Sequence, residues 1–323
     1  MQITGFFATL VFVSALTSVS SAQEWPTRPI RIVVPFPAGG SADVQSRVIA
    51  DELANALGQS VIVENKPGAG GNIGAAEAAR AQPDGYTLFM ATTGTHASNI
   101  SLYAKLPYDP IKDFAPLTLV TINQQVIVSG SKYNGSNLNE LIAKLKSAGA
   151  LANYGSSGIG SGTHLAGELF NRVAGTSMVH VPYRGQGPAL NDLLGGQLDL
   201  MFPLVPDVLS LVESGKLRAF AIMSERRTKT LPNIPTTAEL GYPRLLLSSI
   251  WTGLYTNAGT PKPVIDRLNR ELVRIVSSQR FKDKFEAIGF EVRSTSPDEF
   301  GAFAASETIR WGEIIRTLNI RID

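Results

Sequence analysis

Apolar and polar residues alternate in blocks along most of the chain, and the spacing within each block predicts strands and helices in turn. The run R-P-I-R-I-V-V-P at 28–35 is apolar enough for a strand that is buried on both faces. From Val44 to Leu57 the apolar residues recur at helical spacing, and Gly58 ends this helix. The next expected elements are a strand at 61–63, a helix at 72–81 and a strand at 86–91. This alternation predicts a mostly parallel sheet.

The same rhythm restarts in the second part of the chain, without a residue-level repeat. Helices are expected at 138–146, around 165–173, at 189–194 and at 208–213, with strands at 151–154, 178–181, 198–202 and 217–222. A further strand is expected at 250–255, followed by helices at 263–276, 279–287 and 297–318. We expect these last helices to pack back on the first sheet.

Together the elements predict an α/β fold with two lobes, each built around a mostly parallel sheet. The chain is expected to cross between the lobes near 122–130 and again near 242–250. Lobe 1 then comprises 23–124 with 248–323, and lobe 2 comprises 125–247. Ligands of open α/β sheets bind beyond the carboxyl ends of the strands. Two lobes that turn those ends toward each other therefore form a ligand cleft.

The first 22 residues carry no charged side chain and have the pattern of a cleavable signal peptide. The apolar run at 6–13 is too short to span a bilayer, and S-S-A at 20–22 supplies the small residues of a cleavage site. We therefore expect a mature chain that begins at Gln23 and is secreted into the periplasm. The sequence contains no cysteine, so we expect neither disulfides nor a lipid anchor.

Composition and charge narrow the range of partners. Hydrophobic residues make up 44% of the 323 positions and charged residues 17%, which fits a globular chain with a large core. Lys and Arg number 29 against 27 Asp and Glu, so the chain lacks the electrostatic footprint of a protein that binds nucleic acid or an anionic membrane. We therefore expect no nucleic-acid partner.

Several patterns that suggest enzyme or nucleotide chemistry do not complete a site. G-A-G-G-N-I-G at 68–74 follows a strand, but its glycine spacing and the lack of an acidic residue after the next strand disfavour a dinucleotide. The loop at 155–163 spaces its glycines like a phosphate loop, yet Ser161 stands where the lysine is needed. No G-x-S-x-G elbow occurs, and the three histidines lack the spacing of metal ligands. We expect no enzyme activity, catalytic residue, metal or cofactor.

Two glycine-rich turns favour anion binding instead. Each follows a strand and opens a helix, at 37–43 in lobe 1 and at 155–164 in lobe 2. The first backbone N–H groups of a helix lack partners within the helix and lie at the positive end of its dipole. Two such turns from opposite lobes predict the capture of a carboxylate mainly through backbone N–H groups.

These segments resemble the Bug/TctC family of extracytoplasmic solute receptors, which serve tripartite tricarboxylate transporters. The resemblance rests on W-P-T-R-P-I-R-I-V-V-P-F-P-A-G-G at 25–40, V-E-N-K-P-G-A-G-G-N-I-G at 63–74, P-D-G-Y-T-L at 83–88, Y-G-S-S-G-I-G at 154–160, V-P-Y-R-G at 181–185 and G-G-Q-L-D at 195–199. It covers nearly all of the expected mature chain. It implies a two-lobed Venus-flytrap receptor for carboxylates such as citrate, dicarboxylates, amino acids or aromatic acids.

The resemblance also implies which residues bind the ligand. The first-lobe loop maps onto Phe36, Ala38, Gly39 and Asp43, the cleft turn onto Thr93 and Thr95, and the second-lobe loop onto Ser156, Ser157, Gly158, Ser161, Thr163 and His164. Ser41 lies where the family varies and is a candidate for tuning selectivity. Arg184 either pairs with a distal carboxylate or packs structurally. Asp199 is expected to order the cleft rather than meet an anion, because like charges repel.

The function implied by the resemblance is transport. The protein is expected to act as a monomer, to bind a small carboxylate and to contact integral-membrane transporter subunits transiently. Two alternatives stay open: a receptor that reports its ligand to a signalling partner, and an α/β enzyme. The sequence does not identify the acid, because backbone capture of a carboxylate leaves specificity to the shape of the loops.

Overall fold

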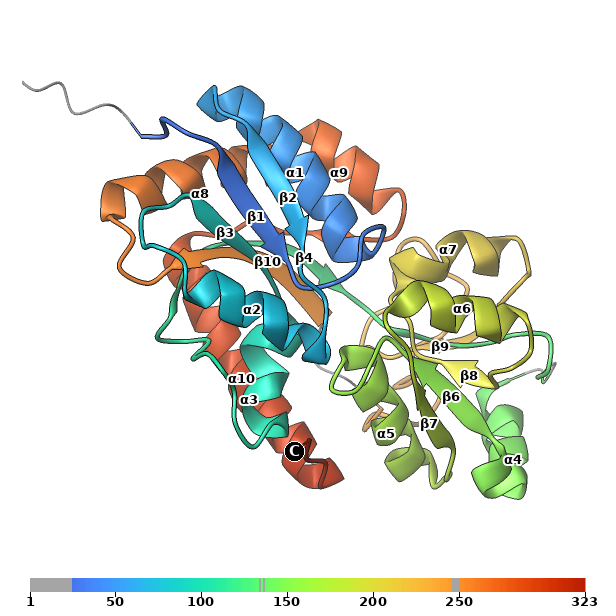
Figure 1. Cartoon of the computed structure of the whole chain (residues 1–323). Helices are drawn as coiled ribbons and strands as arrows, with labels where there is room; N and C mark the ends of the chain where they lie inside the picture. The colour runs from blue at the N-terminus through green and yellow to red at the C-terminus, as the bar shows by residue number, and fades with distance from the viewer. Residues whose placement is uncertain (1–24, 134, 136, 246–249, 323) are drawn as a thin grey trace, which may run out of the picture.

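The chain forms two α/β lobes that lie side by side, as Figure 1 shows. In this computed structural model the described residues are 25–133, 135, 137–245 and 250–322. The predicted signal peptide at 1–22 lies outside them. Within the described part of the chain, no helix combines the length and the apolar character that a membrane crossing requires.

The first lobe is built on a six-stranded sheet whose strands come from both halves of the chain. Its order is β11 (Glu291–Val292), β4 (Phe114–Asn123), β10 (Ile250–Asn257), β3 (Thr87–Thr92), β1 (Ile30–Val34) and β2 (Val61–Asn65). One face carries α1 (Ser41–Leu57), α8 (Lys262–Val276) and α9 (Gln279–Glu286), and the other α2 (Asn72–Ala79), α3 (Asn99–Leu102) and α10 (Pro297–Leu318). Short helical turns, η1 (Ala69–Gly71) and η2 (Gly94–Ser98), follow β2 and β3.

The second lobe has a five-stranded sheet formed by the middle of the chain. Its order is β7 (Val179–Pro182), β6 (Asn153–Ser156), β8 (Leu200–Met201), β5 (Val126–Ser129) and β9 (Arg218–Ile222). One face carries α4 (Leu138–Ala148), the turn η3 (Gly149–Leu151) and α5 (Gly162–Ala174), and the other α6 (Gln186–Leu194) and α7 (Val205–Glu213). Figure 1 shows these two pairs of helices on opposite sides of the sheet.

The two-lobed α/β fold is confirmed, but both sheets are mixed, which corrects the prediction of a mostly parallel sheet in each lobe. In lobe 1, β1 is parallel to β2 and β3, whereas β10 is antiparallel to β3 and β4. In lobe 2, β6 is parallel to β7 and β8, and β5 is antiparallel to β8 and β9. The reason is the double crossing between the lobes. Strands β5 and β10 start at the junction and run away from the cleft, while their neighbours run toward it.

Two segments join the lobes beside the cleft. The first passes from β4 to β5 through Gln124 and Gln125, and the buried Gln125 forms a β-bridge with Leu204 of lobe 2. The second leads from β9 back to β10 and includes residues 246–249, which lie outside the described part. The lobe boundaries after residues 124 and 247 stay a prediction.

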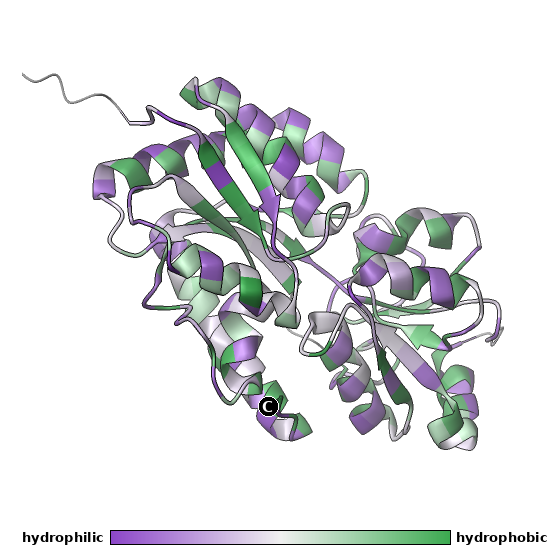
Figure 2. Cartoon of the chain, in the orientation of Figure 1, coloured by the Kyte–Doolittle hydropathy of each residue, from purple (hydrophilic) through white to green (hydrophobic). Residues whose placement is uncertain are grey.

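Aromatic side chains hold the C-terminal helix on the first sheet. Trp251 of β10 and Trp311 of α10 are fully buried. Trp251 also packs edge-to-face on Phe300, with ring centroids 5.5 Å apart. Burial of one large apolar side chain contributes about 1.5–3 kcal/mol, so this cluster fixes α10 against β4 and β10. In Figure 2 hydrophobic residues concentrate along the strands, and hydrophilic residues along the outer sides of the helices.

Candidate functional site

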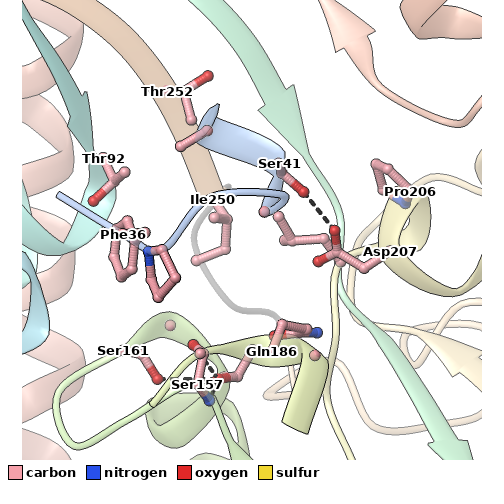
Figure 3. Close-up of a pocket in the computed structure, with 18 of the residues that line it drawn as sticks. Phe36, Ser41, Thr92, Ser157, Ser161, Gln186, Pro206, Asp207, Ile250 and Thr252 are labelled. Carbon is pink, nitrogen blue, oxygen red and sulfur yellow. Dashed lines mark hydrogen bonds between the residues drawn. The ribbon is translucent and has the colours of Figure 1, made fainter. Parts of the chain in front are cut away.

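A cleft with a volume of about 600 Å³ lies between the lobes. In lobe 1 its walls come from the loop after β1, the turn after β3 and the start of β10. In lobe 2 they come from the loops after β6, β7 and β8. Figure 3 shows Phe36 and Ser41 on the first-lobe side, facing Ser157 and Ser161 of the second lobe. The cleft thus lies where parallel strands of both lobes end, the usual place for a ligand in such sheets.

The first-lobe loop, residues 36–43, is shaped from beneath by one buried carboxylate. Gly39 has φ +84°, a left-handed conformation that favours glycine. Its N–H donates to Asp43 Oδ2 over 2.9 Å. Arg47 Nε and Asn65 Nδ2 donate to the same carboxylate, each over 2.9 Å. Burial opposes ionisation, but these three hydrogen bonds lower the pKa of Asp43 below its usual value. Asp43 therefore fixes the loop as a carboxylate, and it is not among the described residues that line the cleft.

The helix that follows this loop, α1, presents open backbone donors to the cleft. Its N-cap is Gly40, and no side chain of the described residues caps it. The N–H groups of Ser41 and Ala42 belong to the first helical turn and have no partner within the helix, and both residues line the cleft. Together with the positive end of the helix dipole, these N–H groups favour an anion.

The second-lobe loop, residues 156–164, is held by its own hydroxyl groups. Ser161 caps α5, because its Oγ accepts a hydrogen bond from the N–H of His164 over 3.3 Å. Thr163 Oγ1 accepts from the N–H of Ser157 over 2.9 Å. The same Oγ1 lies 3.0 Å from the Oγ atoms of both Ser157 and Ser161. The three hydroxyls thus form one cluster at the wall of the cleft.

Part of this loop turns its backbone N–H groups away from the cleft. Gly158, at φ +130°, donates its N–H to Ser156 Oγ over 3.1 Å, and a second loop N–H donates to His164 Nδ1 over 3.2 Å. Within the described chain, Ser156, Gly158 and His164 do not line the cleft, and they support the loop from behind. The donors that face the cleft are the first-turn N–H groups of α5, on Gly162 and Thr163.

The histidines of lobe 2 are neutral. His164 stacks on His180 of β7 with ring centroids 4.0 Å apart, and Ser156 Oγ lies 2.6 Å from His180 Nε2. Burial lowers the pKa of His164 to about 4, and burial together with the neighbouring His164 lowers the pKa of His180 to about 3. Neither ring therefore supplies a cation near neutral pH. Among the described residues, no group of three or more His, Cys, Asp or Glu could hold a metal ion.

The turn after β3 contributes one hydroxyl to the cleft and uses another for its own support. Thr93 lines the cleft, and its Oγ1 accepts the N–H of Trp251 at the start of β10 over 2.8 Å. Thr95 is fully buried, and its Oγ1 accepts the N–H of Thr92 over 3.1 Å. Thr93 thus connects the turn to the strand that leaves the junction, whereas Thr95 orders the turn from behind.

The other two charged candidates lie at opposite ends of the second sheet. Arg184 follows β7, is exposed and lines the cleft, and no described residue forms an ion pair with it. Asp199 precedes β8, where its carboxylate accepts from the N–H of Asn153 over 2.8 Å and pairs with Lys132 Nζ over 2.6 Å. Because β6 and β8 run toward the cleft, Asp199 lies at the far end of the sheet. It therefore orders the starts of two strands and not the cleft.

Sequence reasoning missed lining residues at the lobe junction, in the segments after β7 and β8 and in the segment after α9. These residues are Gln125, Gln186, Leu204, Pro206, Asp207, Ile250, Trp251, Thr252, Ile288 and Phe290. The carboxylate of Asp207 accepts a hydrogen bond from Ser41 Oγ across the cleft. Burial raises the pKa of Asp207 to about 6, against the opposing effects of hydrogen bonds from the Ser41 hydroxyl and the Leu204 backbone. Its position just after a lobe-2 strand is the signal that could have found it, because adjacent parallel strands end at one edge.

Comparisons with known proteins cover most of the chain. The family profile described as the tripartite tricarboxylate transporter family receptor, TctC, matches residues 45–320. Protein BugT of Bordetella pertussis is 36% identical over 313 residues, which cover 97% of this chain and 96% of BugT. The similarity to BugT therefore includes both lobes and both cleft loops.

Three solved structures share the fold over their whole length. One, described as a periplasmic transporter, is 38% identical with a TM-score of 0.87, covering 93% of this chain and 100% of the other. Rpa4515 of R. palustris with adipate is 32% identical with a TM-score of 0.88, at the same coverage of 93% and 100%. MatC from Rhodopseudomonas palustris with bound malate is 32% identical with a TM-score of 0.85, covering 90% and 100%.

Proposed function

The chain belongs to the tripartite tricarboxylate transporter receptor family, TctC, and from that premise we propose that it captures a small organic carboxylate in its cleft and delivers it to a membrane transporter of the tripartite tricarboxylate type. The resemblance seen in the sequence is thereby confirmed. Like the other members of this receptor family, the protein is a solute-binding receptor and not an enzyme. The adipate and malate in the two R. palustris structures support a carboxylic acid as the ligand.

One observation carries the proposal: two helices from opposite lobes begin at the same cleft. Helix α1 offers the N–H groups of Ser41 and Ala42, and α5 offers those of Gly162 and Thr163. The hydroxyl cluster of the second-lobe loop lies beside them. A carboxylate has two oxygens and about four acceptor sites, so it can accept from both helices at once. Such a ligand binds the two lobes to each other.

We also propose where and in what form the receptor acts. A relative described as a periplasmic transporter supports action in the periplasm. In this proposal residues 1–22 serve as a cleavable signal peptide, and the mature receptor is a monomer that contacts the transporter transiently. N-terminal sequencing of the native protein should begin at or near Gln23. An uncleaved chain in the cytoplasm would contradict this part of the proposal.

The binding function is tested directly with a panel of organic acids. Differential scanning fluorimetry of the mature protein should show a rise in melting temperature with a subset of small carboxylates, because a ligand that binds only the folded state stabilises it. The corresponding methyl esters are the matched control, since they keep the carbon skeleton and lose the anion. A panel in which esters and acids shift the melting temperature equally would rule out carboxylate capture.

Closure of the lobes gives a second, independent measurement. A ligand that contacts both lobes favours the closed arrangement by the difference between its affinities for the two forms. Small-angle X-ray scattering should therefore give a smaller radius of gyration with a saturating cognate acid than without it. An unchanged scattering profile at saturation would contradict a flytrap mechanism.

A further inference from the structure

Only two of the described residues that line the cleft carry a charge, and the charges are opposite. They are Arg184 and Asp207, and the rest of the lining is apolar, hydroxyl, amide or glycine. The side chains around the cleft therefore sum to no net charge. A receptor that used its side-chain charges to hold two carboxylates would need cations at both ends of the ligand. This cleft offers one cation and one anion.

The sheet topology separates these two charges on either side of the anion-binding loop. In lobe 2 the order β7-β6-β8 places β6 in the middle, and the three strands are parallel and end at the cleft. Arg184 follows β7, the loop with Ser157 and Ser161 follows β6, and Asp207 lies beyond β8 near the start of α7. Neighbouring strands lie about 4.8 Å apart, so the outer two end roughly 10 Å from each other. Figure 3 shows Asp207 across the cavity from Ser157 and Ser161.

Asp207 is placed as an acceptor that its protein partners do not saturate. It lies in the first turn of α7, is half-buried, and extends toward Ser41 and the interior of the cleft. The Ser41 hydroxyl and the backbone N–H of Leu204 satisfy two of the roughly four acceptor positions of this carboxylate, so the others are open to a ligand. The raised pKa of Asp207, which burial causes, shows that its charge is poorly solvated and gains from a donor.

A second acceptor without a donor lines the same cleft. Gln125 is buried, and its Nε2 donates to the carbonyl oxygens of Phe202 and Gly162 over 2.8 and 3.2 Å. These two carbonyls fix the orientation of the amide, so the other atom, Oε1, is the oxygen. No described residue donates to Oε1. Gln125 bridges to Leu204, the N-cap of the helix that carries Asp207. Buried acceptors of this kind are normally satisfied by water or by a ligand.

From these positions we propose that the ligand is a small amino carboxylate, whose carboxylate binds at the helix starts and whose ammonium group is bound by Asp207. The inference rests on the proposed function and narrows it from carboxylates in general to zwitterions. Arg184 supplements the backbone donors at the anionic end. Gln125 Oε1 is a second acceptor at the cleft wall that has no donor among the described residues. A second carboxylate at that end would meet the charge of Asp207, and like charges repel.

The test compares acids of equal length that differ only at the far end. Isothermal titration calorimetry of the mature wild-type protein at pH 7.5 uses two matched sets, 4-aminobutyrate with succinate and butyrate, and 6-aminohexanoate with adipate and hexanoate. An ammonium bound to a carboxylate is a charge-assisted hydrogen bond, worth tenfold or more in affinity. We expect the best amino acid of the panel to bind at least about tenfold more tightly than the dicarboxylate and the plain acid of its length.

Asp207→Asn is the decisive variant, because asparagine keeps the size of the side chain and removes the charge. We expect this variant to lose about tenfold in affinity for the amino acid and to gain affinity for the matched dicarboxylate. Glu225→Gln removes one charge from the exposed surface of the same lobe, away from the cleft, and should leave both affinities unchanged. Thermal melting of each variant without ligand reports whether it folds, and the wild-type panel needs no variant at all.

The possible results separate this inference from the proposed function. Preference for the amino acid in the wild type, reversed in Asp207→Asn, supports the assignment. A dicarboxylate that binds as tightly as the best amino acid, with no change in Asp207→Asn, overturns the zwitterion assignment and leaves carboxylate capture intact. A wild-type protein that binds none of these acids, and none of the broader organic-acid panel, overturns the proposed function and this inference with it.

Discussion

The two loops that bring helix starts to the cleft share one plan, a strand followed by a glycine-rich turn and a helix, yet they are stabilised in different ways. The first-lobe loop depends on Asp43, a single buried carboxylate that accepts three hydrogen bonds from behind. The second-lobe loop depends on a cluster of hydroxyls, centred on Thr163, that also faces the cleft. In the first loop the supporting carboxylate is not part of the cleft wall, whereas in the second the same side chains support the loop and line the cleft.

This difference also decides how many backbone donors each helix offers. Gly40 leaves the start of α1 without a side-chain cap, so its first-turn N–H groups are open. Ser161 caps α5 and accepts the N–H of His164, which leaves fewer donors. The second loop replaces the missing donor with hydroxyl groups. We therefore expect the first-lobe loop to depend on one residue, Asp43, and the second-lobe loop to depend on several hydroxyl groups together.

Removing the essential support should have the largest effect. Asp43→Ala leaves the N–H of Gly39, Arg47 and Asn65 without their shared acceptor, and the loop is then free to leave the cleft wall. We expect the affinity for the cognate acid to fall by about ten- to a hundredfold and the free energy of unfolding by about 2–4 kcal/mol. Calorimetry and urea unfolding measure the two effects.

Asp51→Asn is the matched control for this prediction, because Asp51 is an exposed acid on the same helix. It should change neither quantity. If Asp43→Ala binds the acid like the wild type, the first-lobe loop does not depend on its buried carboxylate, and the contrast between the two loops fails.

Lowering the pH should destabilise the two loops in different pH ranges, because their titratable groups have different pKa values. The pKa of Asp43 is lowered, so its contribution to stability is present above the unfolded value of 3.8 and is lost only as the pH falls through the lower folded value. The histidines behind the second loop have folded pKa values of about 4 and about 3 against 6.5 when unfolded. Between those values the unfolded chain binds more protons, so their contribution is already lost as the pH falls from 6.5 toward 4.

His180→Gln keeps a polar side chain but removes the titrating ring. Between pH 6.5 and 4.5 we therefore expect the free energy of unfolding of the wild type to fall by about 1–3 kcal/mol more than that of this variant. Hydrogen exchange at pH 4.5 should show loss of protection in β6, β7 and α5 before the first-lobe loop. Equal loss in both loops, or an unchanged slope in His180→Gln, would contradict this order.

The strand and helix pattern found most of the fold, because local periodicity decides those elements. Helix 297–318 was predicted with the bounds that α10 has. It begins with Pro297 after a capping box at Ser296 and Glu299, a purely local signal. The direction of β10 was not accessible in this way. It depends on the return crossing from lobe 2, and a strand has the same pattern in either direction.

The residues of the candidate site also fall into those that a local motif predicted and those that depend on the folded structure. Phe36, Ala38 and Gly39 were placed in the cleft by their sequence motif and lie there. Gly158 was predicted as a ligand-binding residue of a loop that captures a carboxylate mainly through backbone N–H groups, but its own N–H donates to Ser156 Oγ. Which of several loop N–H groups faces outward depends on the φ and ψ angles of each residue, and the sequence does not specify them. Asp207 was missed because its neighbour in the cleft, Ser41, lies 166 positions away.

A smaller effect is expected at the centre of the hydroxyl cluster. Thr163→Val keeps the shape of the side chain and leaves the N–H of Ser157 without its acceptor. We expect a loss of about three- to tenfold in affinity for the acid and about 1 kcal/mol in unfolding free energy, because Ser161 still caps α5. Thr176→Val is the matched control, since it lies in the same lobe behind the cleft. A loss as large as that of Asp43→Ala would show that lobe 2 also depends on one residue.

The smallest effect, and the sharpest test of distributed support, is expected at Ser157. Ser157→Ala removes one hydroxyl of the cluster but keeps the backbone N–H that bonds to Thr163, so we expect a loss of only about two- to threefold in affinity.

When Ser157→Ala is combined with Thr163→Val, the two losses should not add, because the hydroxyls are 3.0 Å apart and share one network. Asp43→Ala lies in the other lobe, so combined with Ser157→Ala it should add within about 0.5 kcal/mol for unfolding. A double-mutant cycle measured by urea unfolding and by calorimetry gives both coupling energies. Strict additivity of Ser157→Ala and Thr163→Val would show that the hydroxyls act independently, and the second-lobe loop would then have no cluster to distribute its support.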